Sequence, residues 1–550
     1  MSSRVTKTKP VIVPDLRHMS ISRTGRLVPL FVTALALAAC GSTVQQKGQA
    51  NSPLTYDPTT STQTPTAPAT TDTTQGGGTL VPGAGTPTTA ATTGSSNSST
   101  TSSANSVTSN VGATAGATKA ATTTTKTVTG TTITTVKPSV PATGRGWDKE
   151  YVYVGVVTAN DVNAVAKQLG LKSIDGGDQE GEATAMANAI NANGGLFGRK
   201  IKLVFHDLKG NDILSAPETA ASSTCQYYAQ DHQVIAVLSP VGGIDTASFR
   251  SCLAKNKVAL FSVNTAPMDN VIGQSFAPYY YSMVTPSWNS LAPVLVSSLK
   301  AQGYFGGWDT ATNSAGTAPV KVGVLVGITD VSIRVGNLVA NSLKAQGYTP
   351  VVYSNDPKDF ASAVLKMSGS GVTHILLPDG GQALFMLTAA TQKYFPRYGL
   401  SSADAPEAAL AANVPAAVLH GVMGVGWSPS LDVSDANDPG DTNAAETTCK
   451  SIYSKAGFEF SGRRLAEAIA LSYCDGLRII TEGATAGVGL TPLSIYKGVV
   501  TIAPKFKSAL SFGSGLNPTH LNIPGAVRPF GYIDACSCFR YTSTKNIVLP

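Results

Sequence analysis

Short apolar runs alternate with segments of helical character from Trp147 to the end of the chain. Nearly continuous apolar strands that are separated by helices are typical of parallel sheets covered by helices on both faces. The expected strands are 151–157, 201–205, 234–238, 258–263, 320–326, 349–353 and 372–377, and the expected helices are 181–193, 215–231, 246–256, 291–302, 335–346, 360–367 and 382–392. Because these units exceed one sheet of ordinary size, the sequence predicts an α/β protein with two lobes.

Residues 41–146 consist largely of Thr, Ser, Ala, Gly and Pro. Such a segment buries too little apolar surface to offset its chain entropy, so we expect a disordered tether over 40–146. The basic residues are concentrated at the N-terminal end: six against one acidic residue before residue 40, five against two in the tether, and 29 against 30 afterwards. The near-neutral remainder offers no field for nucleic acid, and none is expected as a partner.

An apolar run of 13 residues, 27–39, follows Arg23 and Arg26. It is too short to cross a bilayer core of roughly 30 Å as a helix, but it fits the apolar region of a signal peptide. Residues 37–41, Leu-Ala-Ala-Cys-Gly, resemble the lipobox of a bacterial lipoprotein signal. The resemblance implies that residues 1–39 are removed and that Cys40 carries acyl chains such as palmitate. The protein would then be anchored on the extracytoplasmic face of the cell membrane.

Two alternatives stay open at the N-terminus. Translation starts at Met1 or at Met19, and the second start gives a signal of more ordinary length. A secretory signal that is cleaved near an incidental cysteine is the alternative to lipidation.

Residues 189–201, Ala-Ile-Asn-Ala-Asn-Gly-Gly-Leu-Phe-Gly-Arg-Lys-Ile, resemble the IN-x-x-GG-x-x-G-R-x-I segment of type I periplasmic solute-binding proteins of the branched-chain amino acid class. Residues 204–221 resemble that family's next strand, acidic residue and helix. Residues 234–243 and 258–266 resemble its following strands with their loops. The ordered series covers roughly residues 150–400, with a looser match to the end.

The resemblance implies a two-lobed type I periplasmic-binding-protein fold in which the chain crosses between the lobes three times. Lobe one would combine residues 147–283 with 419–511, and lobe two would combine 284–418 with 512–550. A hinge would close the lobes over a small polar, amino-acid-like ligand. The expected role is the solute-binding component of an ABC importer, with ABC permease subunits as partners.

Ligand contacts are expected where loops follow strands, because free N–H groups lie there. Donors to a ligand carboxylate would come from Gly242, Gly243, Asn264 and Thr265, and an ammonium acceptor from Asp330 or Asp379. Structural alternatives stay open, since the glycines also suit a tight turn and the polar residues also suit helix caps. The family's serine-rich ligand loop is replaced here by residues 240–243, Pro-Val-Gly-Gly, and Tyr279–Tyr281 are expected to be packing aromatics.

Six cysteines follow Cys40, and an even number in an exported chain favours disulfides. They are Cys225, Cys252, Cys449, Cys474, Cys536 and Cys538. Cys225 and Cys252 fall on successive expected helices that flank one strand, and this spacing allows contact. Cys449 and Cys474 both lie in the segment that is expected to return to lobe one. The last two would share one face of a strand, where their mutual bond would be strained, so cross-pairing stays open.

No catalytic constellation is present: the sequence has no G-x-S-x-G, H-E-x-x-H or P-loop motif. His206 and His374 are expected to be buried structural residues. The sequence therefore predicts a binding protein without turnover, metal or cofactor. A ligand-sensing lipoprotein that signals to a membrane partner is the main alternative, and a cell-surface hydrolase ranks last.

Overall fold

The computed structural model describes residues 124–128, 131–135, 140–168, 174–354, 356, 359–380, 383–440, 443–516 and 521–550. The predicted signal, Cys40 and most of the predicted tether lie outside the described residues. Within the tether, strands β1 (Thr124–Val128) and β2 (Thr131–Thr135) pair antiparallel. Nine of the ten residues in these two strands are β-branched, and such residues favour strands.

The first sheet has five parallel strands in the order β4-β3-β5-β6-β7. Their bounds are β3 (Tyr151–Thr158), β4 (Lys200–Asp207), β5 (Ala236–Ser239), β6 (Ala259–Ser262) and β7 (Tyr280–Ser282). The helices of the same part of the chain are α1 (Val162–Gln168), α2 (Gln179–Ala192), α3 (Gly210–Ser215), α4 (Pro217–Gln226) with the π-helical turn η1 (Tyr227–Asp231), α5 (Ala247–Lys255) and α6 (Asn270–Phe276). We call this sheet and its helices lobe one. Strands β5, β6 and β7 are buried at every position and β3 at most positions, as expected for a sheet covered on both faces, whereas the edge strand β4 is buried only at Ile201.

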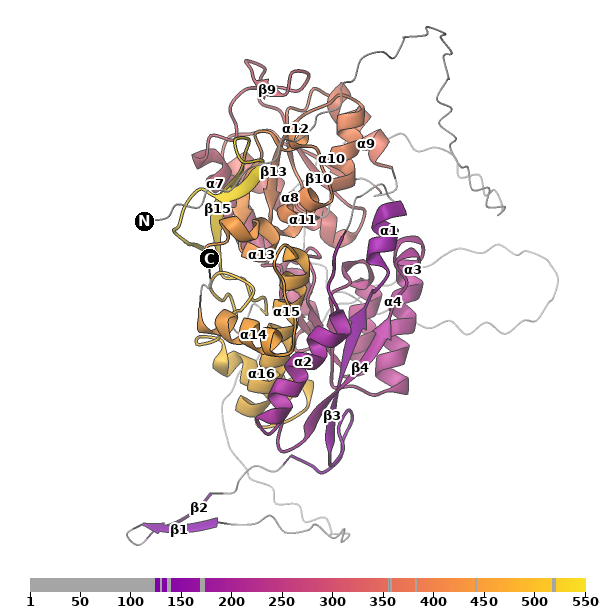
Figure 1. Cartoon of the computed structure of the whole chain (residues 1–550), viewed down its shortest axis with the longest axis vertical. Coiled ribbons are helices and arrows are strands. Elements are labelled where there is room, and N and C mark those ends of the chain that lie inside the picture. The colour runs from indigo at the N-terminus through magenta and orange to yellow at the C-terminus, as the bar shows by residue number, and fades with distance from the viewer. Residues whose placement is uncertain are drawn as a thin grey trace, which may run out of the picture. The chain divides into compact units, whose positions relative to one another are not determined.

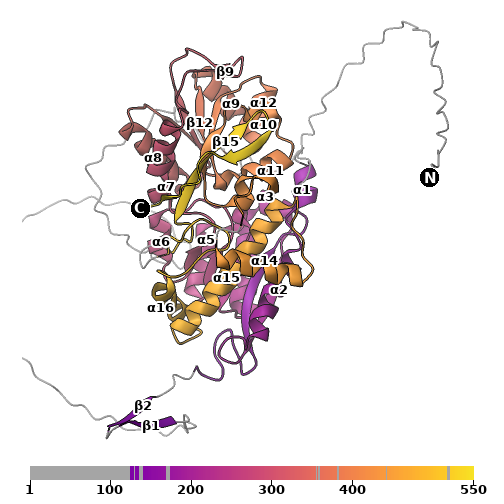
Figure 2. The same cartoon turned by 60° about the vertical axis from the view of Figure 1, so that its left-hand side comes forward.

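Three helices from much later in the chain complete lobe one. They are α14 (Ala444–Lys455), α15 (Arg464–Ala486) and α16 (Pro492–Ile502). In Figures 1 and 2 the orange helices α14 and α15 lie beside the purple helix α2, and α16 packs on α15. Gly476 brings α15 close to the sheet, because a Cβ there would lie 2.5 Å from Leu238 Cδ2. The long helix α15 therefore forms part of the lobe-one core.

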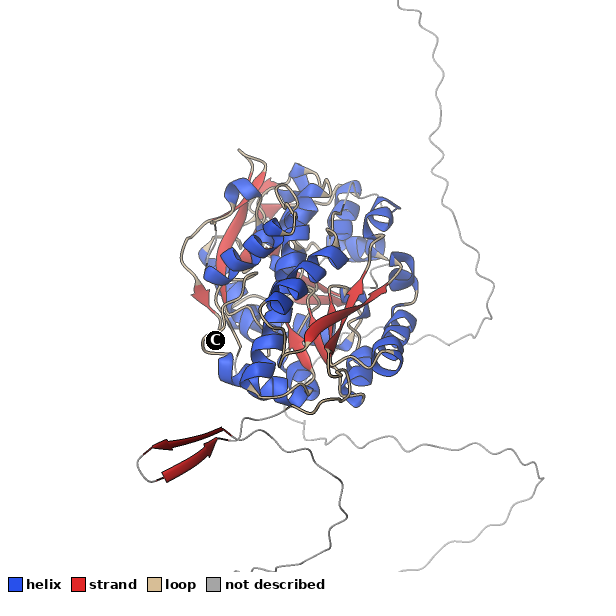
Figure 3. Cartoon of the chain, turned by 60° about the horizontal axis from the view of Figure 1, so that its bottom comes forward, coloured by secondary structure: helices blue, strands red, loops and turns tan. Residues whose placement is uncertain are grey.

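The second sheet follows the order β11-β10-β12-β13-β14-β15-β16, with β17 paired to β15. Strands β10 (Val322–Val326), β11 (Val351–Ser354), β12 (His374–Leu376), β13 (Arg397–Ser401) and β14 (Met423–Gly426) are parallel, while β15 (Ala526–Ile533), β16 (Cys538–Tyr541) and β17 (Ile547–Val548) are antiparallel. The helices here are α7 (Trp288–Ala301), α8 (Asp330–Ala345), α9 (Phe360–Gly369), α10 (Ala383–Thr391), α11 (Pro406–Ala411), α12 (Ala416–Leu419) and α13 (Pro429–Asp432). A short hairpin pairs β8 (Trp308–Asp309) with β9 (Ser314–Ala315). We call this sheet and its helices lobe two, and Figure 3 shows the helices (blue) around the strands (red).

The chain passes between the lobes after β7, after β14 and before β15. The three crossing segments are bonded to one another. Trp427 Nε1 donates to the Val284 carbonyl at 2.7 Å, and the Phe512 amide donates to the Trp427 carbonyl at 2.9 Å. The crossings therefore form one joint at which the lobes meet.

Two predicted boundaries were wrong. The return to lobe one does not begin at residue 419, because β14 still pairs with β13 in the second sheet. Lobe one also starts before Trp147, because Arg199 Nη2 donates to the Pro141 carbonyl at 2.8 Å.

The expected strands and helices up to residue 392 are all present, with ends shifted by a few residues. The α/β class with two mostly parallel sheets is thereby confirmed. Helix α8 begins at Asp330 behind the N-cap Thr329, five residues before the predicted start at 335. Tyr280 and Tyr281 are buried in β7 as packing aromatics, and Tyr281 stacks on Phe261 with ring centroids 4.4 Å apart. None of the described helices is long and apolar enough to span a membrane.

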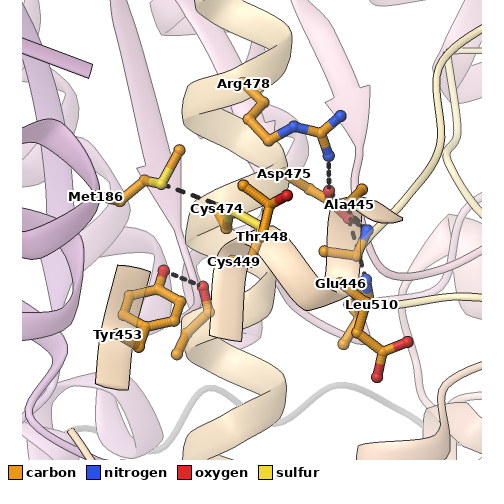
Figure 4. The surroundings of a disulfide bond; sticks show 12 residues. Met186, Ala445, Glu446, Thr448, Cys449, Tyr453, Cys474, Asp475, Arg478 and Leu510 are labelled. Atoms are coloured by element: carbon orange, nitrogen blue, oxygen red, sulfur yellow. Dashed lines mark hydrogen bonds and ion pairs between the residues drawn. A yellow bond between two sulfur atoms is a disulfide. The ribbon is translucent and has the colours of Figure 1, made fainter. Parts of the chain in front are cut away.

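All six described cysteines form disulfides: Cys225–Cys252 joins α4 to α5, Cys449–Cys474 joins α14 to α15, and Cys536–Cys538 lies where β15 turns into β16. Figure 4 shows the second bond, with Met186 Sδ of α2 3.4 Å from Cys474 Sγ. The expectation of strain in the third bond assumed that both cysteines lie in one strand. The chain reverses there instead, with Ser537 at a φ of 49°, and no cross-pairing occurs.

Candidate functional site

A cavity of about 390 Å³ lies at the carboxyl end of the lobe-one sheet. The loops after all five strands contribute to its wall, at Ala159, Gly210, Pro240–Gly242, Val263–Thr265 and Val284. Open α/β sheets bind their ligands at this edge, where loops and helix N-termini meet. The cavity also has the size of a small-molecule site.

Two helices and the crossing segments close the remaining sides of the cavity. Helix α1 contributes Val162, Val165 and Ala166, while α15 contributes Leu465, Ala468 and Ile469. Leu431 and Leu510 come from the second and third crossings. Apart from three glycines, every lining residue is apolar except Gln179, Asn264 and Thr265, and no described lining residue is charged.

The polar side chains in the wall are mostly engaged within the protein. Asn264 Nδ2 donates to the Ser239 carbonyl at 3.0 Å, and its Oδ1 accepts from the Ala266 amide at 2.9 Å. Gln179 Oε1 accepts from the Ala159 amide at 3.2 Å. The Thr265 hydroxyl and the Gln179 Nε2 group make no hydrogen bond within the described part of the chain. These two groups are the lining side-chain donors that have no partner among the described residues.

Gly242 and Gly243 open the short 3-10 helix η2 (Gly242–Ile244). Gly242 lines the cavity, and a Cβ there would meet Asn264 Oδ1 only at the ordinary contact distance of 3.5 Å. Gly243 does not line the cavity. A Cβ at Gly243 would lie 2.5 Å from Ile213 Cγ2. The absence of a side chain at Gly243 therefore leaves room for Ile213, which lines the cavity.

The structure does not bring Asp330 or Asp379 to the cavity. Asp330 is exposed in the first turn of α8, which belongs to lobe two. Asp379 follows β12, and its Oδ2 accepts from the Gly327 amide while its Oδ1 has no hydrogen-bond partner among the described residues. Burial raises the pKa of Asp379. The predicted ammonium acceptors and the predicted carboxylate donors therefore do not share one described cavity.

Lobe two buries two further carboxyls that the sequence analysis did not select. Asp404 Oδ2 accepts from the Ser401 amide at 2.8 Å, and Asp432 Oδ2 accepts from the Tyr541 hydroxyl at 2.6 Å. Burial raises the pKa of Asp404 to about 8 and that of Asp432 to about 7. Both follow parallel strands, as Asp379 does, but the sequence analysis did not predict β13 or β14, so a search of predicted strand ends could not find them.

The lobes also contact each other away from the crossings. Arg334 of α8 forms a two-pronged ion pair with Asp269 of lobe one, with Nε 2.5 Å from Oδ2 and Nη2 3.2 Å from Oδ1. Ala166 of α1 packs with Ala412 of lobe two in a small apolar cluster. Because Ala166 also lines the cavity, this cluster connects the wall of the cavity to the opposite lobe.

The comparisons with known proteins agree with this architecture. The family model described as periplasmic binding protein matches residues 165–448, just over half of the chain, and the chain belongs to this family. It is a family of extracytoplasmic solute-binding proteins and not of enzymes. A search of curated proteins found no match.

Solved structures with the same fold include several type I periplasmic binding proteins. A fatty acid ABC transporter substrate-binding protein from Thermomonospora curvata has a TM-score of 0.52 and 15% identity, over 74% of this chain and 93% of that one. A periplasmic binding protein type 1 from Bordetella pertussis Tohama I has a TM-score of 0.51 and 14% identity, over 73% of this chain and 100% of that one. A leucine-binding protein, LivK, from Thermotoga maritima has a TM-score of 0.51 and 13% identity, over 72% and 99%. At such identities the likeness shows the fold.

Proposed function

We propose that this chain is the solute-binding component of an ABC importer and captures a small molecule in the lobe-one cavity. The observation that carries the proposal is the position of the cavity. It lies at the carboxyl ends of five parallel strands and is bounded by residues of all three crossings, Val284, Leu431 and Leu510. Rotation of the lobes about the joint changes the walls of a cavity that lies beside it. A ligand that binds the closed form more tightly than the open form therefore favours closure.

The volume of the cavity suits a small molecule. The names printed for the fold relatives include both a fatty acid protein and leucine-binding proteins. Because these names differ in ligand class, they support import of a small solute without selecting one chemistry.

The N-terminal sequence supports a membrane anchor for this protein. Cys40 lies outside the described residues, and its lipidation is proposed from the lipobox-like residues 37–41 alone. An acylated Cys40 would hold the binding lobes on the extracytoplasmic face, near a permease in the same membrane. Replacing Cys40 with alanine should move the protein from the membrane to the soluble fraction, whereas a Ser42→Ala control should leave it bound.

Ligand capture is tested with the mature chain in a thermal-shift screen of metabolites that spans amino acids, sugars, organic acids and apolar compounds. A ligand at 100 times its dissociation constant stabilises the folded state by about 2.7 kcal/mol. The liganded protein should then stimulate the ATPase of its cognate ABC permease. Failure of every compound class to stabilise the chain would contradict solute capture, and binding to a membrane kinase in place of a permease would favour the sensor alternative.

A further inference from the structure

We infer that the cavity takes a mostly hydrocarbon ligand with a single oxygen-bearing head group, and not a zwitterionic amino acid. This inference rests on the proposed function, because it names the ligand class of the same cavity. It differs from the small polar ligand that the sequence resemblance implied.

The first step is the charge balance of the wall. No described lining residue is charged, and the predicted acceptors Asp330 and Asp379 lie elsewhere in lobe two. A zwitterion would bring both an ammonium and a carboxylate into a wall of aliphatic side chains. Moving an unpaired charge from water into such surroundings costs far more than moving a neutral group. In the described arrangement of the lobes, the wall therefore offers no charged partner to either end of an amino acid.

The second step is the supply of hydrogen bonds from the side chains. Asn264 uses one N–H of its amide on the Ser239 carbonyl and one lone pair of its Oδ1 on the Ala266 amide. The lining side-chain groups that donate to no described residue are the Thr265 hydroxyl and the Gln179 Nε2 group. Two donors of this kind suit one hydroxyl, carbonyl or carboxyl head group, and the aliphatic wall accommodates the remaining carbon atoms.

The third step is the exposed apolar surface of the wall. Leu214 of α3 lines the cavity while 48% of its surface is exposed. Its neighbour Ile213 also lines the cavity, and Gly243 makes room for it. Apolar side chains that continue from a buried wall to an exposed rim favour ligands whose hydrocarbon part reaches the rim.

The test uses 1-octanol, octanoate and leucine as probes in calorimetric titrations of the mature chain. Octanol or octanoate should bind at least tenfold more tightly than leucine, with a negative heat-capacity change from apolar burial. The stronger of the two identifies a neutral or an anionic head group. Tighter binding of leucine, or no binding of either hydrocarbon probe, would overturn the inference.

A matched pair of variants places the binding in the cavity. Leu214→Asp puts a carboxylate on the wall and should weaken the better hydrocarbon probe at least tenfold. Leu365→Asp makes the same change on α9, at a leucine that is 64% exposed and does not line the cavity, and should leave the affinity unchanged. Both sites are exposed, so equal melting temperatures are expected and verify the fold. Equal affinities of the two variants for the probe would show that it does not bind in this cavity, and would refute the assignment of a hydrocarbon ligand to the cavity. The proposed function would survive that result if a polar metabolite from the screen bound and stimulated the permease.

Discussion

Replacing Asp404 with asparagine should remove most of one pH-dependent contribution to folding stability. Burial raises the pKa of Asp404 from its ordinary 3.8 to about 8, and the neighbouring Asp379 and Asp432 add to the effect. Because the folded protein holds this proton more tightly than the unfolded chain, the contribution is fully present below pH 4. It is lost as the pH rises to about 8. This rise in the pKa of Asp404 corresponds to a contribution to the unfolding free energy of at most about 6 kcal/mol.

Asparagine has no proton to lose, and its side-chain oxygen still accepts from the Ser401 amide. Urea unfolding at pH 5 and pH 9 should show that Asp404→Asn gains several kcal/mol over the unsubstituted protein as the pH rises. Asp330→Asn, at an exposed carboxyl of lobe two, serves as the control and should show no such gain. The reasoning is refuted if the stability difference between Asp404→Asn and the unsubstituted protein is the same at both pH values.

Three further predictions concern the disulfide on α15, the ion pair between the lobes and the glycine behind the cavity wall. Replacing Cys449 and Cys474 with alanine together should lower the unfolding free energy by about 3 kcal/mol, measured by urea denaturation, because the bond closes a loop of about 25 residues. Arg334→Met removes the ion pair to Asp269 and should weaken closure, seen as a larger radius of gyration of the liganded protein in X-ray scattering; an unchanged radius would exclude this role. Gly243→Ala should lower stability by about 1–3 kcal/mol through overpacking and also weaken ligand binding, since the displaced isoleucine fills part of the cavity; a variant with full affinity would contradict the assigned contact.

Much of the fold was predictable because its strands are continuous apolar runs between turns. Val322–Val326 is buried at every position, so its sequence carries the signal of a central parallel strand. The sequence analysis missed the short strand β7, the parallel strands β13 and β14, and the antiparallel strands β15 to β17, which follow one another without helices. Short or half-exposed strands gain their stability from tertiary pairing, and local periodicity does not show it.

The candidate site was predictable only in part. Gly242, Asn264 and Thr265 line the cavity, and all three were selected because they follow strands of one sheet. The same rule selected Asp379, which lies at the carboxyl end of the other sheet. The rule fixes a residue at a strand end, but it does not state which strand ends share a cavity. The same rule does not predict the cavity-lining residues of α15, because this helix packs on strands that lie far earlier in the chain.

The distribution of covalent links favours capture by movement of rigid lobes. Cys225–Cys252 and Cys449–Cys474 both join helices of lobe one, and Cys536–Cys538 lies within lobe two. No disulfide among the described residues bridges the lobes. Contacts across the joint are hydrogen bonds, such as that of Trp427 to Val284, and they can be exchanged at a cost of about 1 kcal/mol each. The described disulfides thus stiffen the individual lobes and place no covalent link between them, an arrangement compatible with the proposed closure by rotation at the crossings.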